Sequence, residues 1–201
     1  MKQTIIDKDK SYTFSDYFKL DPPIDELLDY FGYSRQVEKY DFPKSTIDIQ
    51  AFVGLKTLLE DSLRHVDLNT EIARRETLIA PVLVRLAIYL NIQLRVEYPM
   101  KVNHQLKGKI DYFMQRKHNV LIVEAKRGDL QRGFTQLSVE LIAMDKWLDD
   151  DEKPIYGTVT MGNAWQFSVL NRQTKVITQD MNLYPIPKSL DELLTILLTI
   201  L

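Results

Sequence analysis

Apolar residues recur along this chain with two spacings, one typical of helices and one typical of strands. Helical spacing predicts helices over residues 22–33, 46–63 and 69–91, and Pro81 predicts a kink or a break in the third. From about residue 92 the spacing becomes that of strands, which are predicted over residues 92–102, 106–115 and 119–126. Further along the chain we expect a helix over 132–148, strands over 155–161, 165–171 and 175–179, and a final helix opened by a capping box of Ser189 and Glu192.

This order of elements predicts an α/β fold in which helices flank a mixed central β-sheet. A length of 201 residues suits one compact domain. Within it we expect a core over residues 67–180, an N-terminal helical extension over 1–66 packed on that core, and a C-terminal helix within 181–201. The final segment, LLTILLTIL, carries more apolar surface than a lone helix can bury, which favours a homodimer or a partner subunit.

Two of the predicted strands, 106–115 and 119–126, form a hairpin with a short turn. Turns of two or four residues give the same register, in which Asp111 lies opposite Glu124. Side chains alternate along a strand, so Glu124 and Lys126 share one face. The hairpin therefore predicts two carboxylates and an amine close together.

Two carboxylates that face each other on central strands repel, and burial strengthens the repulsion. A divalent cation would offset it, and Mg²⁺ (or Mn²⁺) prefers oxygen ligands. With Lys126 beside the ion to steady a water nucleophile or developing negative charge, these groups suit metal-assisted hydrolysis of a phosphodiester. The structural alternative is a strand that emerges into solvent, its last charged residues paired with each other or with Asp111.

Asp111 followed by Glu124-Ala125-Lys126 resembles the D…(D/E)-x-K signature of the PD-(D/E)xK nuclease superfamily, with Ile110 in place of the name-giving proline. The segment NTEIARRETLIAPVL is similar to the first-helix motif of the nuclease domain of type I restriction enzyme R subunits. Together the matches cover residues 68–145. The resemblance implies a restriction-endonuclease-like fold, metal binding by Asp111 and Glu124, and a catalytic role for Lys126.

The same resemblance implies an acidic residue on the helix before the hairpin, and two glutamates compete for that place. Glu71 matches the family position as a further metal ligand, whereas Glu76 flanks the same apolar stripe on its other side. An acid in the first turn also complements the helix dipole, which is a structural account of Glu71. On the following helix Gln136 matches a catalytic glutamine, but Glu140 stands where the family has a tyrosine.

Basic residues surround the predicted site. Between residues 101 and 132, Asp129 is the sole acid besides Asp111 and Glu124. Lysine and arginine supply contacts to nucleic-acid phosphates. The residues expected to contact DNA are Arg74, Arg75, Lys109, Arg127 and Arg132.

Several function classes are excluded or disfavoured. The chain has no cysteine, which excludes disulfides, thiolate metal sites and cysteine nucleophiles. Gly108-Lys109 lacks the upstream glycine of a phosphate-binding loop, so no nucleotide cofactor is expected, and no Gly-x-Ser-x-Gly motif is present. The sequence starts without a signal-peptide-like apolar run and has no segment long enough to span a bilayer, so we expect a cytoplasmic protein without a membrane partner.

The sequence thus predicts a metal-dependent nuclease that hydrolyses DNA phosphodiester bonds, in restriction, defence or repair. The alternative is a catalytically silent nuclease-like fold that acts as a nucleic-acid-binding or assembly module. A net charge of −2, which provides no global basic surface, favours this alternative. A subunit that is inert without its partner is a third reading.

Overall fold

The central sheet contains strands from both halves of the chain. The computed structural model describes residues 6–20, 22–43, 49–117, 119–126, 128–149 and 153–201. Within them the strands are β1 (Ser34–Glu38), β2 (Leu94–Lys101), β3 (Lys107–Arg116), β4 (Asn119–Ala125), β5 (Ile155–Thr160), β6 (Ala164–Asn171), β7 (Val176–Asp180) and β8 (Tyr184–Pro185). These eight described strands form one sheet in the order β1-β7-β6-β5-β4-β3-β2, with β8 paired to β6. The β1–β7 and β4–β5 pairs are parallel and the others are antiparallel, which confirms a mixed α/β fold.

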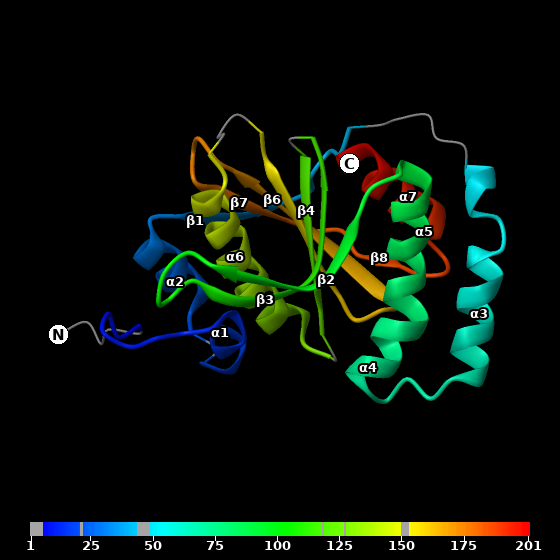
Figure 1. The fold of residues 1–201 in the computed structure, drawn as a ribbon, viewed down its shortest axis with the longest axis horizontal. Coiled ribbons are helices and arrows are strands. Elements are labelled where there is room, and N and C mark those ends of the chain that lie inside the picture. Colours follow the sequence, from blue (N-terminus) through cyan, green and yellow to red (C-terminus); the bar gives the residue numbers. More distant parts are fainter. Residues whose placement is uncertain (1–5, 21, 44–48, 118, 127, 150–152) are drawn as a thin grey trace.

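Helices cover both faces of this sheet (Figure 1). One face packs against α1 (Phe14–Leu20), α2 (Ile24–Phe31) and α6 (Leu130–Trp147). The other packs against α3 (Leu55–His65), α5 (Ala80–Leu90) and α7 (Leu190–Ile200). Alternation along β4 divides its side chains between the two cores, so Ile122 faces the α6 side and Val123 the α5 side.

The β3–β4 hairpin has the predicted register. Arg116 pairs with Asn119 and Gln115 with Val120, and the ladder continues to Tyr112 and Val123. The next pair in this register would be Asp111 with Glu124. Sequence alternation and a short turn were sufficient to predict this arrangement, because a slip of one residue would have placed apolar and polar side chains on the wrong faces.

The helix expected over residues 69–91 is interrupted before Pro81. It consists of α4 (Glu71–Arg74), one π-helical turn η2 (Arg75–Ile79), and α5. Proline lacks an N–H and its ring crowds the preceding turn, so the regular hydrogen-bond ladder cannot pass through this position. Single π-helical turns are frequent at functional sites, and this one carries Arg75.

The first 45 residues contain more structure than the single helix expected over 22–33. Both α1 and β1 lie there, and β1 extends the sheet from within the segment expected as a helical extension. Residues 44–48 lie outside the described part, and the helix expected over 46–63 appears as a short 3₁₀-helix η1 (Ile49–Phe52) followed by α3. Four of the five β1 residues are exposed, so this edge strand has no apolar alternation to reveal it.

Two expectations for the final helix are corrected. Ser189 precedes α7, but its side chain makes no capping hydrogen bond, so the capping box is wrong. Leu193, Leu194 and Leu197 are fully buried within the chain's own core, where α7 contacts α5 and β4. The apolar surface that favoured a homodimer is therefore covered inside the monomer.

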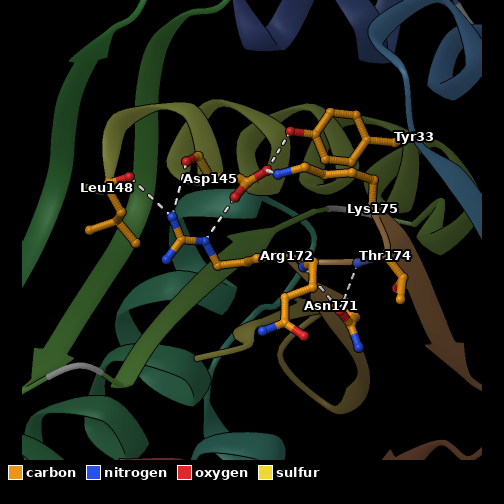
Figure 2. A network of polar contacts seen from close by, with 8 residues as sticks. Tyr33, Asp145, Leu148, Asn171, Arg172, Thr174 and Lys175 are labelled. Carbon is orange, nitrogen blue, oxygen red and sulfur yellow. Dashed lines mark hydrogen bonds and ion pairs between the residues drawn. The ribbon is translucent and has the colours of Figure 1, made fainter. Parts of the chain in front are cut away.

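A buried ionic network fastens the C-terminal end of α6 to β6, β7 and β1 (Figure 2). The Asp145 carboxylate accepts hydrogen bonds from Arg172 Nε at 2.8 Å, from Lys175 Nζ at 2.7 Å and from the Tyr33 hydroxyl. Arg172 also donates to the main-chain oxygen of Leu148 at 3.1 Å. The network thus fixes the C-terminal end of α6 on the sheet. The N-terminal end of the same helix lies beside the end of β4, where Gly133 is close to Lys126.

Candidate active site

Asp111 lies at the point where the β3–β4 ladder opens. Its Oδ2 accepts a hydrogen bond from the main-chain N–H of Ala125 at 2.9 Å, directly beyond the last regular pair of the hairpin. The side chain, 17% exposed, forms an ion pair between Oδ1 and Arg75 Nη1 at 3.5 Å. Asp111 therefore joins β3, β4 and the π-helical turn.

Glu124 is completely buried on the α6 side of the sheet. Its Oε1 forms an ion pair with Lys126 Nζ, while Oε2 has no hydrogen-bond partner among the described residues. Burial and the nearby charge of Asp111 raise the pKa of Glu124 to about 8, against the opposing effect of Lys126. The structure thus places Asp111, Glu124 and Lys126 together, two acids and one amine, as the sequence predicted.

Lys126 occupies a narrow space at the end of β4. Its side chain is 13% exposed, and its ammonium lies 5.0 Å from the centre of the Phe18 ring. Burial alone would lower the pKa of this amine, but the carboxylates of Glu124 and Asp111 outweigh burial and raise it. Lys126 therefore keeps its proton and acts as a cation and hydrogen-bond donor.

Gln136 and Glu140 extend the site on α6. Gln136 Nε2 donates to Glu140 Oε1 at 2.9 Å, and both side chains are buried. Burial and the charge of Glu124 raise the pKa of Glu140 well above its usual value. Sequence reasoning selected Gln136 but left Glu140 without a role, although the spacing of four residues, one helical turn, was the signal that pairs them.

Of the residues predicted to contact DNA, Arg75 forms an ion pair with Asp111 of the site. Besides Asp111, it forms an ion pair with Glu97 at 3.8 Å, and its guanidinium lies 5.2 Å from the centre of the Tyr112 ring. The Tyr112 hydroxyl accepts a hydrogen bond from Arg75 Nε at 3.5 Å. Neither Glu97 nor Tyr112 was singled out from the sequence, because both contacts join Arg75 to strands far along the chain.

The other predicted basic residues are more dispersed. Arg74 donates to the main-chain oxygens of Leu68 and Met161, at 2.7 and 3.0 Å, and so fastens α4 to the loop after β5. Lys109 is exposed and pairs with Glu97 at 2.8 Å. Arg132, in the first turn of α6, pairs with Asp129 at 3.3 Å, and Arg127 falls outside the described residues.

The two helix glutamates occupy different environments. Glu71 begins α4, directly after the N-cap Thr70, whose hydroxyl accepts from Ala73 N at 3.0 Å. Glu76, in contrast, acts on Tyr112. The pKa of the Tyr112 phenol is raised mainly by burial; the charges of Asp111 and Glu76 raise this pKa further, whereas Arg75 lowers it. Glu76 therefore lies within the electrostatic field of the site. Among the described residues, no hydrogen bond or ion pair joins either glutamate to Asp111 or Glu124.

The oxygens of the site meet only part of what a metal ion requires. Within the described ranges, no group of three or more His, Cys, Asp or Glu side chains is arranged to hold one. However, Glu124 Oε2, Gln136 Oε1 and Glu140 Oε2 are buried oxygens without a donor from the described residues. The raised pKa values of Glu124 and Glu140 favour a proton shared between these two carboxyls, and a hard cation with oxygen preference would satisfy the same oxygens in place of that proton. The unsatisfied oxygens belong to Glu124, Gln136 and Glu140, whereas both carboxylate oxygens of Asp111 already have partners in Ala125 and Arg75.

Comparison with known proteins does not identify the site, so its interpretation depends on its geometry alone. No protein-family model matches the chain, and no curated protein or solved structure is significantly similar to it. Among the helices of the described residues, none combines the length and the apolar character needed to cross a bilayer.

Proposed function

We propose that this chain is a Mg²⁺-dependent nuclease with a restriction-endonuclease-like fold, which hydrolyses DNA phosphodiester bonds. The observation that carries the proposal is the convergence of Asp111, Glu124 and Lys126 at the open end of the β3–β4 hairpin. Perturbed acids and amines that gather beside unsatisfied buried oxygens are typical of functional sites. The hydrogen bond from Ala125 accounts for Asp111 structurally, but no such hydrogen bond from the described residues accounts for the fully buried Glu124.

Asp111 and Glu124 would hold the cation. When bound, it would supply Lewis acidity for the phosphate and would lower the pKa of a coordinated water. Lys126, which keeps its proton, would orient the attacking water and stabilise negative charge that develops on the phosphate. Gln136 and Glu140 would hold the Glu124 side chain in place from α6.

Arg75 would contact the nucleic-acid backbone. Its guanidinium is already oriented by Tyr112 and is 16% exposed, so it can exchange its weak contact with Asp111 for a phosphate oxygen. Lys109 and Arg132, both exposed, would add less specific backbone contacts. Glu76 would replace Glu71, the residue that the sequence favoured, as the third acid, because the charge of Glu76 acts on Tyr112 beside Arg75.

The proposal is tested by cleavage of plasmid and single-stranded DNA in Mg²⁺ or Mn²⁺. Lys126→Ala and Asp111→Asn should each lower the cleavage rate at least about 100-fold, the usual effect of removing one preorganised electrostatic group. Lys56→Ala, an exposed lysine on α3, is the matched control and should cleave like the wild type. Equal cleavage, or none, by wild type and Lys126→Ala in every metal and substrate would refute the enzymatic proposal.

A second candidate is a silent nuclease-like module. It is favoured by one observation: each acid already has a cation of its own, Arg75 beside Asp111 and Lys126 beside Glu124. Calorimetric titration with Mn²⁺ separates the candidates. Binding that disappears in Asp111→Asn supports the nuclease, and no binding even with DNA present supports the module.

A further inference from the structure

An aromatic ring from the N-terminal part of the chain covers the proposed catalytic lysine. The ammonium of Lys126 lies 5.0 Å from the centre of the Phe18 ring, within the range of a cation–π interaction. Because Lys126 is only 13% exposed, water weakens this attraction little. Phe18 belongs to α1, outside residues 68–145, which carry the nuclease resemblance.

Helix α1 is held firmly enough to position this ring. Phe14 and Tyr17 are completely buried against α6 and β3. The Tyr17 hydroxyl donates to the main-chain oxygen of Gln105 at 2.9 Å. A Cβ at Gly108 would come within 2.8 Å of the Phe14 ring, so β3 and α1 are in direct contact. Phe18 follows Phe14 by one helical turn and shares its side of α1.

The start of α6 also contacts the Lys126 side chain. A Cβ at Gly133 would lie 3.0 Å from Lys126 Cγ, so the backbone of α6 touches the side chain. The main-chain N–H of Lys126 donates to Thr160 O at 2.8 Å, which fixes the base of the side chain against β5. Beside α6 and Phe18, the ammonium forms its ion pair with Glu124, and the charges of Asp111 and Glu140 also act on it.

We propose that Phe18 is a positioning residue for Lys126, so that α1 forms part of the catalytic centre. This inference rests on the proposed nuclease function. The ring would hold the ammonium at Glu124 and close its access from the α1 side. Loss of the ring would leave Lys126 charged but free to rotate into solvent, where it would no longer steady the attacking water.

The contact itself is tested without any activity. Acetic anhydride labels accessible lysines, and peptide mass spectrometry reports the labelling rate of Lys126 in the metal-free protein. Phe18→Leu keeps an apolar side chain but removes the ring and should raise this rate about tenfold. Phe18→Tyr keeps the ring and should label like the wild type. Leu20→Ala, an exposed residue of α1, is the control. Equal labelling of wild type and Phe18→Leu would overturn the inference, as would equal acceleration in Phe18→Leu and Phe18→Tyr.

Cleavage kinetics test the catalytic consequence. Phe18→Leu should lower kcat about tenfold at unchanged KM, and Phe18→Tyr should restore it. If labelling follows the prediction but kcat does not change, Phe18 covers Lys126 without positioning it for catalysis, and the inference fails. If labelling follows the prediction but the wild type cleaves no DNA, the contact stands and the proposed nuclease function fails instead.

Discussion

The carboxylate of Asp111 takes the place of a main-chain acceptor for Ala125. Asp111 Oδ2 lies 2.9 Å from Ala125 N, one residue beyond the last regular pair of the β3–β4 ladder. A buried N–H without an acceptor is costly, so this side chain has a structural role in addition to any chemical one. While Oδ2 accepts from Ala125, Oδ1 pairs with Arg75.

Substitutions at Asp111 should therefore separate fold from function. Asp111→Asn keeps an oxygen that can accept from Ala125, whereas Asp111→Ala removes it. We expect Asp111→Ala to be less stable than Asp111→Asn by about 1–3 kcal/mol, the cost of an unsatisfied buried N–H. Both variants should be inactive. Urea unfolding of the two proteins measures the difference, and equal stability would show that Ala125 finds its acceptor elsewhere.

The hairpin was predictable because its information is local. Alternating apolar residues on both strands and a short turn define the register, and the register brings Asp111 and Glu124 together. The face of Lys126 follows from the same alternation. No long-range contact had to be known in order to select these three residues.

The surroundings of the site were not predictable, because they depend on contacts between distant segments. Phe18 reaches Lys126 only after α1 has packed on α6, and Tyr112 reaches Arg75 only through the π-helical turn. Strand β1 was missed since an exposed edge strand needs no alternation of apolar residues. The capping box at Ser189 failed because the N-cap residue has φ −104° and ψ 27°, whereas capping side chains usually act from extended backbone.

The raised pKa of Glu124 predicts a specific pH dependence of stability. The unfolded chain loses this proton near the ordinary pKa of glutamate, whereas the folded chain keeps it until about pH 8, because burial and Asp111 disfavour the charge. The unfolded state therefore binds fewer protons between these values, and stability falls as pH rises, by up to about 1.4 kcal/mol per pH unit. Glu124→Gln should match wild-type stability at pH 5 and exceed it at pH 8.

Thermal unfolding at several pH values measures this difference. Glu26→Gln, an exposed position on α2, is the control and should follow the wild type throughout. A constant difference between Glu124→Gln and wild type from pH 5 to pH 8 would contradict the prediction.

The network of Figure 2 should be essential for stability and dispensable for chemistry. Asp145 is buried and forms an ion pair with Arg172. Asp145→Asn leaves the buried guanidinium without its charged partner and should lower the free energy of unfolding by about 3–5 kcal/mol. Lys175→Met removes a partly exposed partner and should cost about 1 kcal/mol or less.

The same network predicts sensitivity to acid. Burial favours the neutral form of Asp145, but hydrogen bonds from Lys175, Tyr33 and Arg172 outweigh burial and lower its pKa. Its contribution is therefore present above the ordinary pKa of aspartate and lost as pH falls through the lowered value. Acid unfolding should begin at higher pH in Lys175→Met than in the wild type.

Gly133 should tolerate no side chain, although alanine favours helices by about 1 kcal/mol over glycine. A Cβ there would lie 2.8 Å from Val159 Cγ1 and 3.0 Å from Lys126 Cγ. Val159 is buried on β5 and is stiff about χ1, so α6 must move away from the sheet. The expected net loss in the free energy of unfolding for Gly133→Ala is about 1–2 kcal/mol.

The control is Gln131→Ala, which is exposed on the same helix and gains helix propensity without a clash. Its free energy of unfolding should be within about 0.5 kcal/mol of the wild-type value. Because Lys126 must shift with α6, Gly133→Ala should also cleave DNA more slowly, whereas a more stable and fully active variant would show that α6 does not confine Lys126.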